Sequence, residues 1–154
     1  VTDLKPETVI ELARRYPDRF IGIKDASGIL SRVTDHRMGI GPGFVQLSGN
    51  DETALPFNAA GGVGCISVTA NVAPRLVAKM NALALEGKAE KARAINEKLL
   101  PVHAAMFVEA NPIPVKWALE QMGKIGRGTR LPLTPLSASY HDSVRAALNA
   151  AGLL

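Results

Sequence analysis

Cysteine, aromatic side chains and long apolar runs are all scarce in this chain of 154 residues. The single cysteine, Cys65, excludes an internal disulfide framework and fits a reducing compartment, so we expect a cytoplasmic location. No apolar run approaches the length of a membrane-spanning helix, so we expect no membrane partner. The aromatic residues are four Phe, two Tyr and one Trp, and none is interleaved with the basic stretch around Arg127. We therefore expect no nucleic-acid partner.

The motifs of several enzyme classes are also missing. Neither G-x-G-x-x-G nor G-x-x-x-x-G-K-[ST] occurs, and no serine lies in a G-x-S-x-G elbow. The three histidines, His36, His103 and His141, form neither H-x-H nor H-E-x-x-H, so we expect no metal site and no cofactor. Cys65 has no nearby histidine or lysine to activate it and is read as a small buried residue. A net charge of +4, with 47% hydrophobic and 21% charged residues, is typical of a soluble globular protein.

Strands alternate with helices in the first half of the chain. Short apolar runs without alternating polar positions indicate parallel strands buried on both faces. The expected order is helix 6–16, strand 20–24, helix 30–40, strand 44–47, helix 53–60 and strand 63–68. This order, with short connections and no phosphate-binding turn, favours part of a (β/α)8 TIM barrel over a doubly wound sheet.

The second half of the chain shows helical patterns without a strand signal. Helices are expected over 72–86, 89–108, 112–122 and 137–151. We predict an α/β fold with two domains. Residues 1–71 form a partial TIM-barrel domain of about three parallel strands, and residues 72–154 form the end of the barrel and a C-terminal α-helical domain. A closed barrel usually needs about 250 residues, so we expect five further strands to precede Val1.

Lys24 ends the first expected strand and is the first candidate catalytic residue. Burial at a strand end disfavours the charged ammonium form, and a neutral lysine amine can form a Schiff base with a carbonyl substrate. The alternative is that Lys24 only caps the strand and reaches water. Alternation places Phe20, Gly22 and Lys24 on one face, with Asp25 pointing away from it.

The ends of the next two strands supply candidate binding residues. Gly49 could let a ligand approach the backbone closely, while Asn50 or Asp51 would cap the following helix. The backbone around Ile66 would lie at the mouth of a barrel, where a carbonyl could accept a hydrogen bond from a ligand. The string from Asn111 to Trp117 is read as a rigid turn into a helix that begins with proline.

These segments together resemble the dihydrodipicolinate synthase (4-hydroxy-tetrahydrodipicolinate synthase) family. The resemblance is carried by GIKDASG at 22–28, LSGND at 47–51, GCISVTAN at 64–71, FVEANPIPVK at 107–116 and RLPLTP at 130–135. It covers essentially the whole chain and identifies it as the C-terminal half of such an enzyme.

The resemblance implies a chemistry and a set of site residues. Lys24 would form an imine with pyruvate, and Ile66 would contribute a main-chain contact to it. The derived enamine would attack the aldehyde of aspartate semialdehyde, in lysine and diaminopimelate biosynthesis. The family is usually a homotetramer in the cytoplasm, and it needs no cofactor.

The resemblance also implies that parts of the active site are missing. The family takes its paired threonines, its proton-transferring tyrosines, an arginine and its allosteric lysine site from the first half of the barrel. The tyrosines present here, Tyr16 and Tyr140, are not at strand tips. We therefore expect the isolated chain to have little or no synthase activity.

Two alternatives remain open at the level of sequence. The chain could belong to another pyruvate-dependent aldolase, such as N-acetylneuraminate lyase or a keto-deoxy sugar acid aldolase, which share the lysine and differ in the second substrate. It could instead be a non-catalytic fragment that serves only for assembly, because an open sheet edge invites self-association.

Overall fold

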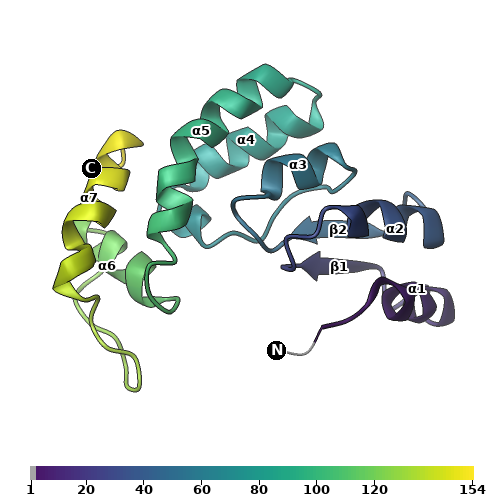
Figure 1. Cartoon of the computed structure of the whole chain (residues 1–154), viewed down its shortest axis with the longest axis horizontal. Coiled ribbons are helices and arrows are strands. Elements are labelled where there is room, and N and C mark those ends of the chain that lie inside the picture. Colours follow the sequence, from purple (N-terminus) through teal and green to yellow (C-terminus); the bar gives the residue numbers. More distant parts are fainter. Residues whose placement is uncertain (1–2) are drawn as a thin grey trace. The chain divides into compact units, whose positions relative to one another are not determined.

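The computed structural model describes residues 3–154, which fall into two compact units, Val1–Ile66 and Ser67–Leu154. The first unit contains α1 (Pro6–Arg15), β1 (Gly22–Asp25), α2 (Ser31–Gly39), β2 (Val45–Ser48) and α3 (Ala54–Ala59). The two strands lie side by side and parallel, and each is followed by a helix (Figure 1). This alternation is the one expected from the sequence, with boundaries moved by one or two residues.

A small apolar cluster holds the first unit together on the helical side of the sheet. Val9 and Ala13 of α1 pack with Phe44, and Phe20 and Ile23 pack against this cluster. The expectation that Phe20 shares a face with Lys24 was wrong. Phe20 lies before β1, which begins only at Gly22, and its ring lies 5.9 Å from that of Phe44 in the apolar cluster.

The third expected strand forms only in part. The carbonyl of Gln46 accepts the N–H of Val63, and the carbonyl of Ser48 accepts the N–H of Ile66. The chain therefore advances three residues where β2 advances two, which is the irregularity of a bulge. Gly64 supplies the required backbone, with φ at +152°, and only the bridge Ser48↔Cys65 remains. The extended strand predicted over 63–68 is thus shortened to one bridge.

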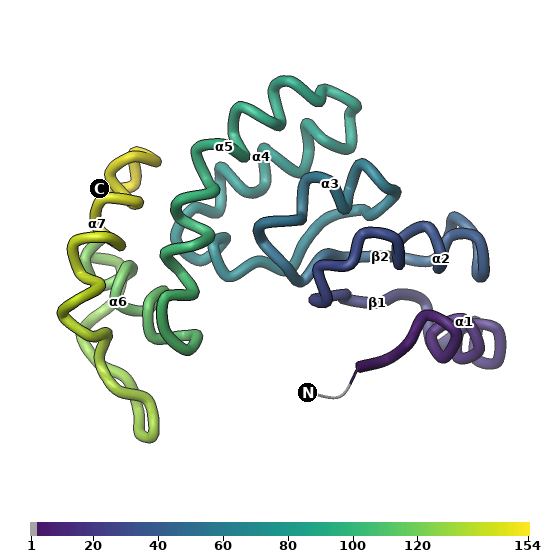
Figure 2. The backbone as a smooth tube through the Cα atoms, viewed as in Figure 1, coloured from purple at the N-terminus to yellow at the C-terminus, as the bar shows by residue number. Residues whose placement is uncertain are grey.

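In the second unit, the regular elements of the described residues are all helices. It contains the 3₁₀ helices η1 (Thr69–Asn71) and η2 (Ala138–Tyr140), with α4 (Pro74–Leu85), α5 (Ala89–Ala105), α6 (Ile113–Gln121) and α7 (His141–Ala150). Helices α4 and α5 form an antiparallel hairpin, and the tube in Figure 2 shows the tight turn between them. Gly87 makes that turn at φ +72°, and the N–H of Lys88 closes it on the Leu83 carbonyl.

The second unit has its own buried core, to which each of the longer helices contributes. Met80 of α4, Leu99 of α5, Ala118 of α6 and Leu148 of α7 are each at most 1% exposed. Thr69 is buried at the start of η1, and its hydroxyl lies 2.7 Å from Nδ1 of His103. Across residues 3–154, no helix combines the length and the apolarity needed to cross a membrane.

Candidate active site

Lys24 is the penultimate residue of β1 and is exposed. Its ammonium makes no hydrogen bond or ion pair with any side chain in the described part of the chain. The sequence left open whether Lys24 is buried or reaches water, and in this chain it reaches water. The reason is that the described helices cover only the opposite face of β1, where Ile23 packs on the apolar cluster.

Gly49 lies directly against the Lys24 side chain. A Cβ atom at Gly49 would stand 2.7 Å from Cε of Lys24 and 2.8 Å from Cβ of Ala26. Real Cβ atoms essentially never approach other heavy atoms within 3.0 Å. The absence of a side chain at Gly49 is therefore what lets the lysine stem run across the end of β2.

Ile66 falls on the same face of the sheet as Lys24 and Gly49. In the parallel ladder Asp25 is opposite Ser48, and Ser48 bridges Cys65. Asp25, Ser48 and Cys65 therefore point to one face of the sheet. Because side chains alternate along a strand, their sequence neighbours Lys24, Gly49 and Ile66 point to the other face. The N–H of Gly49 donates to the Asp25 carbonyl at 2.7 Å, and the N–H of Ile66 donates to the Ser48 carbonyl at 2.8 Å.

The exit of β1 thus brings together three residues that the sequence singled out. Lys24, Gly49 and Ile66 are close in the ladder and share one face, although they come from three separate segments. Ile66 is 50% exposed, and its carbonyl accepts no hydrogen bond from the described residues. The arrangement offers an amine, a backbone without a side chain and a carbonyl acceptor at the same edge.

A cavity of about 410 Å³ lies at the end of β1. Lys24 lines it together with Asp3, Asp25, Ser27 and Arg32, and neither Gly49 nor Ile66 does. The described residues therefore do not enclose all three candidate residues in one pocket. Of the three, only Lys24 borders this cavity.

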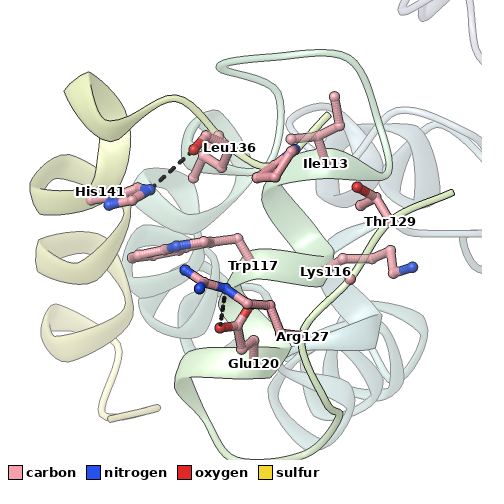
Figure 3. Close-up of a pocket in the computed structure, with 10 residues that line it drawn as sticks. Ile113, Lys116, Trp117, Glu120, Arg127, Thr129, Leu136 and His141 are labelled. Carbon is pink, nitrogen blue, oxygen red and sulfur yellow. Dashed lines mark hydrogen bonds and ion pairs between the residues drawn. The ribbon is translucent and has the colours of Figure 1, made fainter. Parts of the chain in front are cut away.

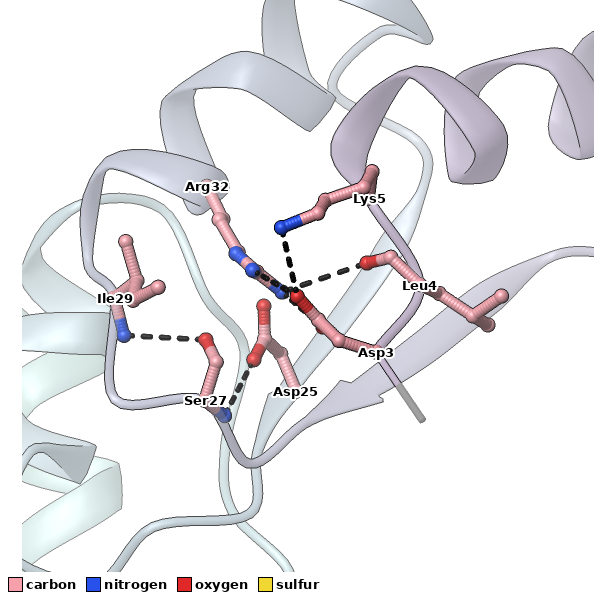
Figure 4. Close-up of polar contacts among 7 residues, drawn as sticks. All are labelled: Asp3, Leu4, Lys5, Asp25, Ser27, Ile29 and Arg32. Carbon is pink, nitrogen blue, oxygen red and sulfur yellow. Dashed lines mark hydrogen bonds and ion pairs between the residues drawn. The ribbon is translucent and has the colours of Figure 1, made fainter. Parts of the chain in front are cut away.

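An ion pair that the sequence did not suggest forms one wall of this cavity. Arg32, at the start of α2 and 8% exposed, binds both carboxylate oxygens of Asp3 at 2.7 and 2.8 Å (Figure 4). Hydrogen bonding from Arg32 lowers the pKa of Asp3 from 3.8 to about 2, and the pKa of Arg32 is raised by the same contact. The two residues are 29 positions apart, so no local pattern could have revealed the pair.

Asp25 follows Lys24 and points to the opposite face, as alternation predicts. It is 8% exposed, and its Oδ1 accepts the backbone N–H of Ser27 at 2.8 Å. Figure 4 shows its carboxylate beside the Arg32 guanidinium, and its negative charge contributes to the raised pKa of Arg32. Asp25 thereby closes the turn after β1.

The polar residues after β2 also differ from the expectation. The helix cap is Thr53, not Asn50 or Asp51, because α3 begins only at Ala54. Asn50 instead accepts the N–H of Glu52 at 3.1 Å, in a turn of its own. The Asn50 side chain thus stabilises the turn that precedes α3 and not the start of the helix itself.

The two tyrosines lie away from the end of β1, and the histidine and acidic side chains form no metal-binding group. Tyr16 is the C-terminal cap of α1, before β1 begins, and Tyr140 belongs to the second unit. In residues 3–154, no group of three or more His, Cys, Asp or Glu side chains is arranged to hold a metal ion. Besides the ion pair of Asp3 with Arg32, the end of β1 offers the primary amine of Lys24 and free backbone groups.

Comparison with known sequences assigns the chain to a family. The model described as "Dihydrodipicolinate synthetase family" matches residues 1–151. A curated protein of Novosphingobium aromaticivorans, named 4-hydroxy-tetrahydrodipicolinate synthase, is 62% identical over 100% of this chain and 52% of its own length. A protein of the same name from Saccharophagus degradans is 56% identical over 99% of this chain and 52% of its length. The chain spans about half the length of the curated relatives it matches.

Solved structures show the same fold. Dihydrodipicolinate synthase from Acinetobacter baumannii, chloride-inhibited and complexed with pyruvate, matches with a TM-score of 0.91 and 40% identity, over 99% of this chain and 52% of that one. The enzyme from Thermotoga maritima matches with a TM-score of 0.90 and 38% identity, over 97% and 51%. The small parallel sheet with its helices is therefore part of a TIM barrel, followed by a helical region. On sequence and on fold alike, the chain belongs to the dihydrodipicolinate synthetase family.

Proposed function

We propose that this chain carries the Schiff-base lysine of a 4-hydroxy-tetrahydrodipicolinate synthase, a lyase that condenses pyruvate with L-aspartate 4-semialdehyde. The observation that carries the proposal is the shared face of Lys24, Gly49 and Ile66 at the end of the parallel strands. Active sites of TIM-barrel enzymes lie at this end of the strands. The names of the curated relatives support the assignment of the reaction.

The amine of Lys24 begins the proposed reaction. Its nitrogen lone pair attacks the ketone carbon of pyruvate, and loss of water leaves an imine. Loss of a methyl proton then converts the imine into an enamine, whose carbon attacks the aldehyde of the second substrate. Cyclisation and hydrolysis release the product and restore the free lysine. The amine must be uncharged to attack, so a covering that removes Lys24 from water favours the first step.

Gly49 and Ile66 have binding roles in this proposal. The Lys24 stem crosses the bare backbone of Gly49, which directs the amine along the sheet face. The Ile66 carbonyl accepts no hydrogen bond from the described residues, so it is available to the hydroxyl group that forms when the Lys24 amine adds to the ketone of pyruvate. We propose that residues 1–71 are the partial barrel that carries this site and that residues 72–154 form the end of the barrel and the helical domain.

The biological setting follows from the same assignment. We place the reaction in lysine and diaminopimelate biosynthesis in the cytoplasm, and we expect a homotetramer, without a metal or an organic cofactor. The groups that transfer protons and bind the second substrate are expected from the part of the relatives that this chain does not cover. By itself, the chain is expected to show little or no synthase activity.

Borohydride trapping tests the proposal. The chain is mixed with the part of the Novosphingobium aromaticivorans relative that it does not cover, then treated with pyruvate and sodium borohydride. Peptide mass spectrometry should find the reduced pyruvate adduct on Lys24. The Lys24→Arg variant keeps the charge but cannot form the imine, so it should give no adduct. Lys98→Arg, at an exposed position of α5, should still give the adduct on Lys24.

Two results would reject the proposal. One is a reassembled protein that is folded and gives no adduct. The other is an adduct that forms equally in the Lys24→Arg variant. If trapping succeeds, comparing aspartate semialdehyde with sugar-acid aldehydes as second substrates separates the synthase from other pyruvate aldolases. A purely structural role for the chain predicts no adduct at all.

A further inference from the structure

The hydrogen-bond ladder on one side of β2 stops one step early. The N–H of Gly49 donates toward β1, to the Asp25 carbonyl at 2.7 Å. The N–H of Ser48 donates to the opposite side, to the Gly64 carbonyl at 3.0 Å. Backbone groups of successive residues in a strand point alternately to its two neighbours. The N–H of Asn50 is therefore the next donor expected on the side of Gly64.

The acceptor in register with this donor is the carbonyl of Ile66. The N–H of Ile66 donates to the Ser48 carbonyl at 2.8 Å, and the N–H and carbonyl of one strand residue face the same neighbour. The expected bond does not form, because the Asn50 N–H donates to Oγ of Ser48 at 3.2 Å. The same hydroxyl donates to the Asn50 carbonyl at 2.9 Å. One side chain thus holds both backbone groups of Asn50.

Ser48 is well placed to compete with the ladder in this way. Its side chain is 1% exposed, so water does not contend for the hydroxyl. A serine hydroxyl has one donor and two acceptor sites, which lets it bind an N–H and a carbonyl together. Such local bonds to the backbone offer an alternative to sheet pairing. In agreement with this, β2 ends at Ser48.

The segment that carries Ile66 is fixed although its carbonyl is free. The N–H of Ile66 is held by Ser48, and the N–H of Gly64 donates to Oδ1 of Asn58 at 2.9 Å. Gly64 needs this side-chain acceptor because the bulge gives the β2 carbonyl to Val63 instead. Asn58 is itself 7% exposed. The acceptor is therefore in place before a ligand arrives, which lowers the ordering cost of binding.

We propose that Ser48 is a positioning residue of the site at Lys24, and this inference rests on the function proposed above. By holding the Asn50 N–H, Ser48 keeps the Ile66 carbonyl available to the substrate. When the Lys24 amine adds to the ketone of pyruvate, a proton passes from the nitrogen to the ketone oxygen, which becomes a hydroxyl. That hydroxyl donates to the Ile66 carbonyl, and an Asn50 N–H on the same carbonyl would compete with it.

The backbone hydrogen bond can be measured in the chain alone, without substrate. Nuclear magnetic resonance detects a scalar coupling between an amide nitrogen and the carbonyl carbon to which its N–H is bonded. We expect no coupling from Asn50 to Ile66 in the unmodified chain. The coupling should appear in Ser48→Ala, in which the competing hydroxyl is absent. It should remain absent in Ser48→Thr, which keeps the hydroxyl.

The effect on the proposed reaction is measured in the reassembled protein at limiting pyruvate. Ser48→Ala should lower the second-order rate constant of borohydride trapping about tenfold, close to the worth of one hydrogen bond. Ser48→Thr should restore most of that rate. The pH dependence of trapping should stay the same in both variants, because Ser48 acts on the Ile66 carbonyl and not on the Lys24 amine.

Thr129→Val is the matched control, because it also removes a hydroxyl that is bonded to the backbone. The Thr129 hydroxyl donates to the Leu133 carbonyl at 3.2 Å. Figure 3 shows it at the border of a cavity in the second unit, which contains none of the three candidate residues. This variant should trap pyruvate as the unmodified chain does. Circular dichroism establishes that each variant is folded.

The outcomes separate this inference from the function on which it rests. A coupling from Asn50 to Ile66 in the unmodified chain, or its absence in Ser48→Ala, would overturn the inference whatever Lys24 does. An unchanged trapping rate in folded Ser48→Ala, or an equal loss in Thr129→Val, would overturn it and leave the role of Lys24 intact. No adduct even in the unmodified protein would instead reject the proposed function, and the role of Ser48 in the reaction with it.

Discussion

At the scale of single residues, Gly49 carries a steric requirement that can be tested. We predict that Gly49→Ala displaces Lys24, because the new Cβ would lie 2.7 Å from Cε of the lysine and 2.8 Å from Cβ of Ala26. Overpacking of this kind typically costs about 1–3 kcal/mol. Borohydride trapping in the reassembled protein should slow by about tenfold. Gly43→Ala is the control, since nothing lies within 4 Å of a Cβ at that position.

A trapping rate that is unchanged in Gly49→Ala would show that the contact between the two residues does not position the amine. An equal loss in Gly43→Ala would point to general destabilisation. The thermal unfolding midpoint of each variant, measured beside the trapping rate, separates these two readings.

A second residue-scale prediction concerns acid stability. The pKa of Asp3 is lowered from 3.8 to about 2 by its hydrogen bonds from Arg32. A carboxyl group whose pKa is lower in the folded state stabilises the fold at pH values above its pKa in the unfolded chain. This contribution is lost as the pH falls from about 4 to about 2. Asp3→Asn should therefore lower stability at neutral pH and match the unmodified chain near pH 2.

Urea unfolding across this pH range measures the difference. Asp18→Asn is the control, because Asp18 is exposed and forms no ion pair with the described residues. A gap between Asp3→Asn and the unmodified chain that persists undiminished down to pH 2 would contradict the assignment of the stabilisation to this ion pair.

At the scale of elements, α5 shows how neighbouring leucines can differ. Leu99 is fully buried, while Leu100 is 41% exposed on the same helix. We predict that Leu99→Ala lowers the free energy of unfolding by about 2–5 kcal/mol, through lost apolar contacts and a cavity. Leu100→Ala should stay within about 0.5 kcal/mol. Chemical denaturation of both variants checks this, and similar losses would place the core of this unit elsewhere.

At the scale of the whole molecule, the lysine face of the sheet is only partly covered. Val45 is 40% exposed and Ile66 is 50% exposed on the face that carries Lys24. Among the described residues no strand pairs with β1 on its other side. Uncovered apolar side chains and an unpaired strand edge favour association.

We therefore predict that the chain self-associates as its concentration rises. Val45→Lys should reduce the association, because it places a charge on this face. Leu131→Lys, at a position 88% exposed in the loop after α6, should leave it unchanged. Sedimentation velocity over a concentration series measures the effect. Association that persists in Val45→Lys and disappears in Leu131→Lys would place the interface on the helical unit.

The order of helices and strands could be read from the sequence, and the proposed site at the end of β1 could be suggested from it, because both depend on local patterns. Apolar spacing, proline and glycine act within a few residues of where they stand, so Lys24, Gly49 and Ile66 could each be placed at a strand exit. That they share one face followed from the register of the strands, which the structure supplied.

Only the tertiary structure decided what covers these residues and which distant partners they meet. The exposure of Lys24 depends on segments packed against its face, and the Arg32 contact with Asp3 joins positions 29 apart. Residues 63–68 have the apolar composition of a strand, but the bulge at Gly64 breaks their pairing with β2. That pairing depends on the register with β2, a separate segment of the chain. Burial, pairing and register arise from contacts between remote segments, which a local pattern does not encode.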